Sequence, residues 1–395
     1  MDLGFLYGFL GFTVWEYVLV TFIMVQVTVM GVTLYLHRDA AHRSLELHPA
    51  LRHFFRLWIW MSSAMLTRDW VAVHRKHHAF SDQPGDPHSP VVFGLRKVLL
   101  EGAELYATEA EKAETLEKYG RGCPDDWLER NVYSRFPNLG ITTMVVLDLF
   151  LFGVPGIIMI AVQMVSMPLF AAGVINGLGH HSGYRNYECD DAARNIVPWA
   201  VLLGGEELHN NHHAFPASAK FSARSWEFDI GWLYIRVLET LGLAKVIRVA
   251  PEPKVVEPSR PLVDLENLRA VIVNRMHVLR AYSRTVTIPV LRSELRLGNA
   301  PSTLKRGVRR LLVRHPTLLD ARAKARLQEV LANHQALQTV HDFRERLRQL
   351  WSGANANNER LLAQFREWCA QAEASGIKAL QDFALSLRGY ALQPA

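Results

Sequence analysis

The apolar residues of this chain gather in long runs near its N-terminus and in its middle. Residues 12–36 are almost continuously apolar, with Glu16 near the start and no charged side chain from Tyr17 to Leu36. About 20 such residues suffice to cross the hydrocarbon layer of a membrane as one helix. The alternative is the core helix of a soluble domain, and the absence of charge favours the membrane span.

A second apolar run extends from Leu139 to Leu178 and is too long for one span. Gly153-Val154-Pro155-Gly156 interrupts it and predicts a tight turn, so we expect two spans, at 137–153 and 156–176. The first of these is short and contains Asp148, whose carboxyl group should face protein or water because burying an acid in lipid is costly.

Basic residues follow the first span and are absent before it, which predicts an outer N-terminus and an inner segment from His37 to Pro137. The second and third spans then return the chain to the inner side near Gly177. All histidine-rich segments would therefore share the cytoplasmic face.

The last third of the chain has a different composition. Residues 250–261 contain four prolines and predict an extended linker after a membrane domain at 1–249. Residues 262–395 show helical periodicity and contain 21 Lys and Arg against 11 Asp and Glu. This balance of +10 leaves −4 for residues 1–261, since the whole chain carries +6. We expect a basic helical appendage there.

The three cysteines are scattered, which argues against a disulfide framework or an iron–sulfur cluster. The N-terminus lacks the features of a cleaved signal peptide, so the first span is expected to remain as an anchor.

The 17 histidines are not spread evenly. Two H-x-x-H-H motifs occur, and residues at i, i+3 and i+4 share one helix face, so each motif presents three imidazoles toward one point. A further pair has the spacing H-x-x-x-x-H, and an asparagine precedes another histidine by four residues. The candidate ligands are His37, His42, His74, His77, His78, Asn176, His180, His209, His212 and His213.

His37 and His42 are five residues apart, about 140° around an ideal α-helix. They can converge only if the helix ends or bulges, so we expect a distortion near Asp39–Ala41.

The number of histidines indicates the kind of site. Imidazole suits zinc, copper, iron and nickel, but a zinc site usually takes four ligands. Nine clustered histidines are too many for one such ion and suit two metals. Carboxylate di-iron bundles use paired Glu-x-x-His motifs, and here only Glu206 and His209 have that spacing. A histidine-ligated di-iron centre is therefore the better interpretation. Nearby acids either orient the imidazoles or are solvated charges: Asp39, Asp69, Asp82, Asp86, Glu206 and Glu207.

The stretches YLHRDAAHRS (35–44), VHRKHH…DPH (73–88), INGLGHH (175–181) and GGEELHNNHHAFP (204–216) resemble the membrane fatty acyl desaturases of the acyl-CoA delta-9 type, in their bacterial branch. The resemblance covers about residues 15–235. It implies an all-α membrane protein whose few spans carry a cytoplasmic helical cap with two irons. By this resemblance the nine histidines are the iron ligands, Asn176 holds a metal-bound water, and no other catalytic residue is needed.

The sequence departs from the family pattern in two places. One span precedes the first histidine motif where the family usually has two. In the family a basic pair that binds the phosphates of CoA usually follows DPH closely. Here the first such pair, Arg96 and Lys97, comes later in the sequence. Acyl-CoA is the expected substrate, with acyl carrier protein and phospholipid as alternative carriers. Trp70, one turn before His74, is the candidate wall of the acyl tunnel.

The resemblance implies an oxidoreductase that uses O2 to place a cis double bond, delta-9 by analogy, in a saturated acyl chain. Oxygen balance then requires two external electrons. Gly177–Gly183 lacks the dinucleotide spacing, so the donor should be a separate ferredoxin, cytochrome or reductase. The alternatives are a membrane di-iron hydroxylase and a metal transporter, although a transporter would place its ligands within the spans. The expected location is the bacterial inner membrane, with the site facing the cytoplasm.

Residues 368–387 (WCAQAEASGIKALQDFALSL) resemble the helical end of some insertion-sequence transposases. No nucleic acid partner is expected. The basic surface of this region is suited to anionic lipid or to an acidic electron donor.

Overall fold

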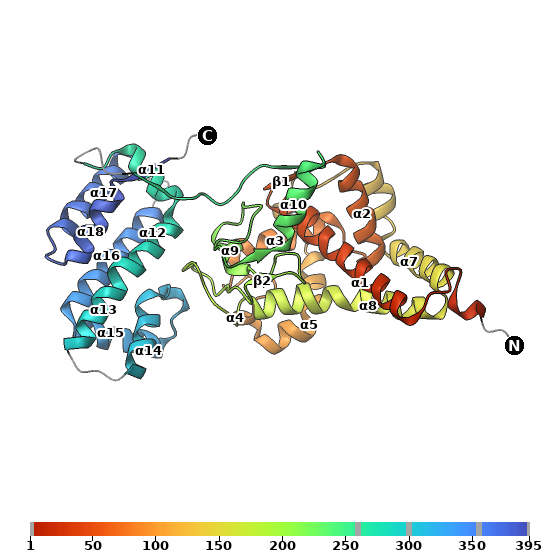
Figure 1. The fold of residues 1–395 in the computed structure, drawn as a ribbon, viewed down its shortest axis with the longest axis horizontal. Coiled ribbons are helices and arrows are strands. Elements are labelled where there is room, and N and C mark those ends of the chain that lie inside the picture. The colour runs from red at the N-terminus through yellow and green to blue at the C-terminus, as the bar shows by residue number, and fades with distance from the viewer. Residues whose placement is uncertain (1–3, 257–261, 298–301, 353–357, 393–395) are drawn as a thin grey trace. The chain divides into compact units, whose positions relative to one another are not determined.

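The computed structural model describes residues 4–256, 262–297, 302–352 and 358–392. The chain forms two compact units, residues 1–185 with 192–250, and residues 186–191 with 251–395 (Figure 1). Residues 257–261 of the predicted linker lie outside the described residues. Residues 251–256 of the predicted linker belong to unit 2, where Lys254–Val255 pairs antiparallel with Tyr390–Ala391.

Unit 1 is mainly helical. Its elements are η1 (Gly4–Tyr7), α1 (Val14–Met30), η2 (Gly31–Ala41), β1 (Leu45–Leu47), α2 (Pro49–Ser63), α3 (Thr67–Phe80), α4 (Pro90–Phe93), α5 (Leu95–Ala110), α6 (Ala113–Tyr119), η3 (Glu129–Tyr133), α7 (Pro137–Phe152), α8 (Val154–Met167), η4 (Pro168–Leu178), β2 (Trp199–Ala200), α9 (His209–Ala214), β3 (Phe228–Asp229), α10 (Ile230–Thr240) and β4 (Ala244–Val246). β1 pairs antiparallel with β4, and β2 pairs parallel with β3.

Two helices of the described residues are long and apolar enough to cross a membrane, Val14–Ala41 with 28 residues and Val154–Leu178 with 25. Each is an α-helix that continues without a break into a π-helix, α1 into η2 and α8 into η4. The first continues beyond the predicted end at 36 and carries His37 in its last turns. The second predicted span is a helix of 16 residues, Pro137–Phe152, which is shorter than the usual requirement of about 20.

The predicted turn between α7 and α8 is centred on Gly153, which has a φ of +65°. The segment after η1 lies against this turn, since the Phe9 and Leu10 amides each donate to carbonyls of α7 at 3.0 Å. Asp148 is 1% exposed and accepts a hydrogen bond of 3.4 Å from Gln163 of α8. The acid therefore faces protein, as predicted.

A Gly153→Ala variant should lower the melting temperature, because its new Cβ would lie 2.2 Å from the Leu6 carbonyl oxygen and its φ would be strained. The expected cost is about 1–3 kcal/mol. Gly11→Ala is the matched control, since Gly11 also has a positive φ but nothing within 4 Å of its Cβ position. Thermal unfolding in detergent micelles measures both. Equal losses would show that the contact with Leu6 is unimportant.

Unit 2 is a helical bundle with its own apolar core, in which Tyr282, Phe365 and Trp368 are buried. Its elements are β5 (Lys254–Val255), α11 (Leu265–Val273), α12 (Arg275–Tyr282), η5 (Ser283–Thr287), α13 (Ile288–Leu297), α14 (Ser302–Val313), η6 (Pro316–Leu318), α15 (Ala321–Ala332), α16 (Gln335–Ser352), α17 (Asn358–Glu373), α18 (Lys378–Leu387) and β6 (Tyr390–Ala391). The helices expected after residue 262 are present.

Candidate metal centre

The nine candidate histidines converge in unit 1 as two neighbouring groups. Group A comprises His37, His42, His74, His78 and His212, and group B comprises His77, His180, His209 and His213. Within each group the ligand nitrogens all lie within 4.8 Å of one another. The histidines come from η2 and the residue that follows it, from α3, from the turn after η4 and from α9, which lie far apart in the sequence.

The π-helix η2 explains the five-residue spacing of the first pair. The His42 amide donates to the His37 carbonyl at 3.0 Å, an i to i+5 bond that widens the turn. The two rings consequently lie 4.9 Å apart on one side of the helix. The distortion predicted near Asp39–Ala41 is present, and it begins earlier, at Gly31.

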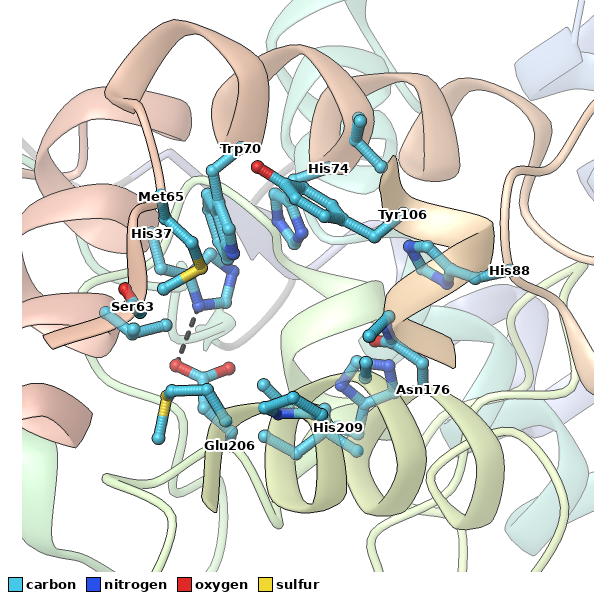
Figure 2. A pocket seen from close by; sticks show the side chains of 18 of the residues that line it. His37, Ser63, Met65, Trp70, His74, His88, Tyr106, Asn176, Glu206 and His209 are labelled. Atoms are coloured by element: carbon cyan, nitrogen blue, oxygen red, sulfur yellow. Dashed lines mark hydrogen bonds and ion pairs between the residues drawn. The ribbon is translucent and has the colours of Figure 1, made fainter. Parts of the chain in front are cut away.

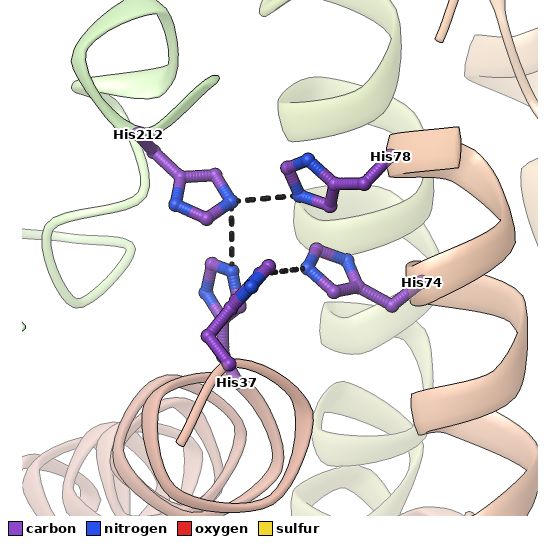
Figure 3. Close-up of side chains that lie close together, drawn as sticks. His37, His74, His78 and His212 are labelled. Atoms are coloured by element: carbon purple, nitrogen blue, oxygen red, sulfur yellow. Dashed lines mark hydrogen bonds between the residues drawn. The ribbon is translucent and has the colours of Figure 1, made fainter. Parts of the chain in front are cut away.

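The histidine nitrogens face one another at ligand spacing. In group A, His212 Nε2 lies 3.0 Å from His37 Nε2 and 2.9 Å from His78 Nε2 (Figure 3). In group B, His209 Nε2 lies 2.9 Å from His180 Nε2 and 3.1 Å from His213 Nε2. Two nitrogens bound at right angles to one ion, each at about 2.1 Å, would be about 3.0 Å apart.

Three carboxylates set which ring nitrogens point inward. Glu206 accepts from His37 Nδ1 at 2.7 Å, Asp86 from His77 Nδ1 at 3.0 Å, and Asp82 from His180 Nδ1 at 2.8 Å. Each of these imidazoles then presents an Nε2 lone pair toward its group. Lone pairs that face one another repel unless a cation lies between them, so the donor set suits metal ions.

Of the six acids near the motifs, three therefore orient imidazoles. The other three have different surroundings. Asp39 forms an ion pair with Arg52, and Glu207 accepts from the Leu202 and Leu203 amides. Burial raises the pKa of the Asp69 carboxyl to about 6. Burial also opposes ionisation of Asp82, but contact with His180 and hydrogen bonds from Ser89 and Ala192 outweigh it and hold its pKa at about 2.

Arg38 is a site residue that the sequence did not reveal. Its guanidinium is 0% exposed and lies 3.3 Å from Asp229 and 3.8 Å from Glu206. Its Nε donates to the Ala219 carbonyl at 3.0 Å, and the group lies 3.8 Å from the centre of the Phe221 ring. Arg38 thus fixes Glu206, which in turn orients His37. No local motif announces this, because Asp229 is far away in the sequence.

A cavity of about 300 Å³ adjoins both histidine groups (Figure 2). Its wall is mostly apolar, and its lining comprises Val32, His37, Ser63, Met65, Trp70, Val73, His74, His88, Ala103, Tyr106, Met164, Met167, Pro168, Ala171, Ala172, Ile175, Asn176, Glu206 and His209. Trp70 lies in this wall and stacks on His74 with ring centres 4.7 Å apart.

Asn176 also lines the cavity, near His209, although it belongs to neither histidine group. His88 lies in the wall and stacks on His77 with ring centres 4.4 Å apart. Its position in the DPH motif was the only hint in the sequence that it lies near the site. Arg96 and Lys97 are exposed on α5 and do not line the cavity, and Lys97 lies 3.8 Å from Glu101.

The buried histidines predict acid sensitivity of the metal-free protein. Burial, aided by neighbouring imidazoles, lowers the pKa well below 6.5 for His42, His74, His78, His209, His212 and His213. Below pH 6.5 the unfolded chain binds protons that the folded chain does not, so the free energy of unfolding falls as pH falls. Each extra proton contributes about 1.4 kcal/mol per pH unit.

We therefore expect the melting temperature of metal-stripped protein to fall steeply from about pH 6.5 to 5. Thermal unfolding across pH 8 to 5 measures this. A His181→Asn variant should give the same curve, because His181 is exposed. A flat curve below pH 6.5 would contradict the prediction.

Sequence comparisons give the relatives of each unit. A sequence model described as "fatty acid desaturase" matches residues 13–227. Delta-9 acyl-lipid desaturase 1 of Arabidopsis thaliana is 33% identical over 245 residues, which cover 60% of this chain and 77% of that protein. The sn-1 stearoyl-lipid 9-desaturase of Synechocystis is 34% identical, with 60% and 74% covered. Acyl-CoA 5-desaturase AL21 of Anemone leveillei is 33% identical, with 57% and 69% covered. A model described as "transposase" matches residues 267–393.

Proposed function

The chain belongs to the fatty acid desaturase family, and we propose that it introduces a cis double bond into a saturated fatty acyl chain, using O2 and two electrons from a separate donor. The observation that carries this proposal is the pair of convergent histidine groups beside an apolar cavity. Loss of two hydrogens from adjacent methylenes, together with O2, two electrons and two protons, gives one alkene and two waters.

Two iron ions held by groups A and B would supply the oxidising power that protein side chains lack. His37, His77 and His180 are held by carboxylates in the tautomer that a metal requires. Trp70 and the apolar wall would position the acyl chain and exclude water, while Asn176 would hold a water beside the ions. The ligands lie beyond the apolar part of the spanning helices, which argues against a transporter.

We further propose acyl-CoA as substrate, with its phosphates near Arg96 and Lys97, and delta-9 as the position of the new bond. Both stay open to test, because the relatives are named acyl-lipid 9- and acyl-CoA 5-desaturases. The proposed location is the bacterial inner membrane with the site facing the cytoplasm, and the proposed donor is a ferredoxin, cytochrome or reductase.

The test is expression in a bacterial host with a ferredoxin and its reductase, followed by mass spectrometry of total fatty acids. New cis-monoenes, two mass units lighter than their precursors, would support desaturation, and their double-bond position would give the regiochemistry. Products heavier by one oxygen would support a hydroxylase instead. Purified protein assayed with acyl-CoA, acyl carrier protein or phospholipid would identify the carrier.

A further inference from the structure

Residues 196–203, Ile-Val-Pro-Trp-Ala-Val-Leu-Leu, form an uncharged apolar segment that leads back to the metal centre at Glu206 and His209. Instead of burying these side chains, the fold exposes four of them: Trp199 is 70% exposed, Leu202 62%, and Val197 and Val201 each 42%. Phe228, which pairs with Trp199 on the neighbouring strand β3, extends the same surface and is 41% exposed, and Trp226, two residues before it, is 54% exposed. Contiguous apolar surface of this kind marks a binding partner or a membrane.

Three contacts place this segment along the first spanning helix. The Leu202 carbonyl accepts from the Gln26 side chain at 3.4 Å, the Gly204 carbonyl accepts from the Thr33 hydroxyl at 3.0 Å, and Glu206 accepts from His37. The chain therefore runs beside the helix from the level of Gln26 up to the level of His37. At about 1.5 Å per residue, Leu202 lies roughly 15 Å from the level of the metal centre, toward the N-terminal end of that helix.

We propose that residues 197–203 form a re-entrant loop whose tip lies in the hydrocarbon layer of the nearer leaflet, so that bilayer lipid covers the exposed side chains. A hydrocarbon layer of about 30 Å spans about 20 helical residues. If the layer begins at Val14, it ends near Thr33, and the level of Gln26 is inside it. Trp199 and Trp226 suit the boundary with the head groups, where tryptophan is enriched. This inference does not depend on the reaction catalysed.

Several backbone groups of the loop have protein partners of the kind that such a position requires. Lipid offers no hydrogen bonds, so non-helical backbone can enter it only when protein groups replace water. One Glu207 oxygen accepts from both the Leu202 and Leu203 amides, at 3.0 and 2.9 Å. The Val201 amide donates to the Trp199 carbonyl at 3.1 Å, and the Phe228 amide donates to the Pro198 carbonyl at 2.9 Å. Glu207, itself 4% exposed, thus serves the loop and not an imidazole.

The first test measures what covers the tip. Leu202→Cys is made in a Cys123→Ser background, because Cys189 and Cys369 are buried, and is labelled with the fluorophore NBD in the iron-loaded full chain. The protein is placed in phosphatidylethanolamine and phosphatidylglycerol vesicles. Two controls are labelled in the same way: Phe22→Cys, at an exposed position of the apolar helix α1, and Glu117→Cys, at an exposed position of α6.

We expect nitroxide-labelled lipid to quench the label at 202 as it does at 22, and aqueous iodide to quench only the label at 117. Iodide quenching at 202 equal to that at 117 would overturn the proposal. Protection at 202 from both quenchers would also overturn it, because a protein surface would then cover the tip.

A second test addresses Glu207 without a label. Hydrogen exchange of the Leu202 and Leu203 amides is followed in the same vesicles for wild type, Glu207→Gln and Glu207→Leu. Glutamine keeps an acceptor oxygen and should retain protection, whereas leucine should speed exchange by about tenfold, the equivalent of one hydrogen bond. Iron content of each variant reports whether the metal centre remains intact. Unchanged protection in an iron-loaded Glu207→Leu protein would refute this role.

Discussion

Replacing His212 by alanine should lower product formation by more than about 100-fold, since even residues that only orient metal ligands can cost 10- to 100-fold. The His212 ring bridges group A, with its Nε2 3.0 Å from that of His37 and 2.9 Å from that of His78. The alanine variant lacks one of the five ligand nitrogens of group A. The remaining histidines of the group would then form an incomplete metal site. His77→Ala should do the same to group B.

The matched control is His181→Ala. This histidine lies beside His180 in the sequence but is exposed, and its Nδ1 contacts the Ser182 hydroxyl at 2.8 Å. We expect it to retain activity and iron. Fatty acid profiles of expressing cells and iron stoichiometry of the purified proteins are the two measurements. Persistent monoenes in His212→Ala, or equal losses in His181→Ala, would refute the ligand assignment.

Replacing Arg38 by methionine should lower the free energy of unfolding by about 3–5 kcal/mol, the usual cost of removing one partner from a buried ion pair. The variant leaves Asp229 and Glu206 without their buried cation. Since Glu206 would lose its ion pair with Arg38, it would no longer fix the orientation of His37. We therefore expect the iron content to fall together with the stability.

Two further variants separate charge from packing. Arg130→Met removes an arginine that is 64% exposed and should change stability by less than about 0.5 kcal/mol. Adding Asp229→Asn to Arg38→Met should recover part of the loss, because it removes one of the unpaired charges. Thermal unfolding in detergent micelles compares all three. An Arg38→Met protein as stable as wild type would show that the buried arginine is dispensable.

The histidine groups were predictable because their spacing encodes shared helix faces. A distortion of the first helix was predictable from the five-residue gap, but the gap did not distinguish a π-helix from a helix that ends there. The supporting groups were not predictable. Asp82 and His180 are 98 residues apart, and Arg38 and Asp229 are 191 apart, so no local pattern links them. Only the fold distinguishes Glu206, which orients His37, from its neighbour Glu207, which holds a loop.

The apolar runs predicted the positions of the helices better than their lengths. Both long helices were located from stretches without charged residues. The first helix continues beyond its apolar run, because its π-helical part also includes polar residues up to Ala41. The exposure of Trp199 and Leu202 was not predictable, because an apolar run of eight residues is too short to be a span and also suits an ordinary buried strand.

The wide turn of η2 also determines how this gene can change in length. The five residues closed by the bond from the His42 amide to the His37 carbonyl cover about the same arc as a four-residue turn of an α-helix. Losing one codon between His37 and His42 would therefore convert the wide turn into an ordinary one and would hardly rotate the chain that follows. Leu45 and Leu47, both buried in the strand that pairs with β4, would keep their register. Losing a second codon would rotate them by about 100° about the helix axis, so we expect the fold to tolerate one deletion here and not two.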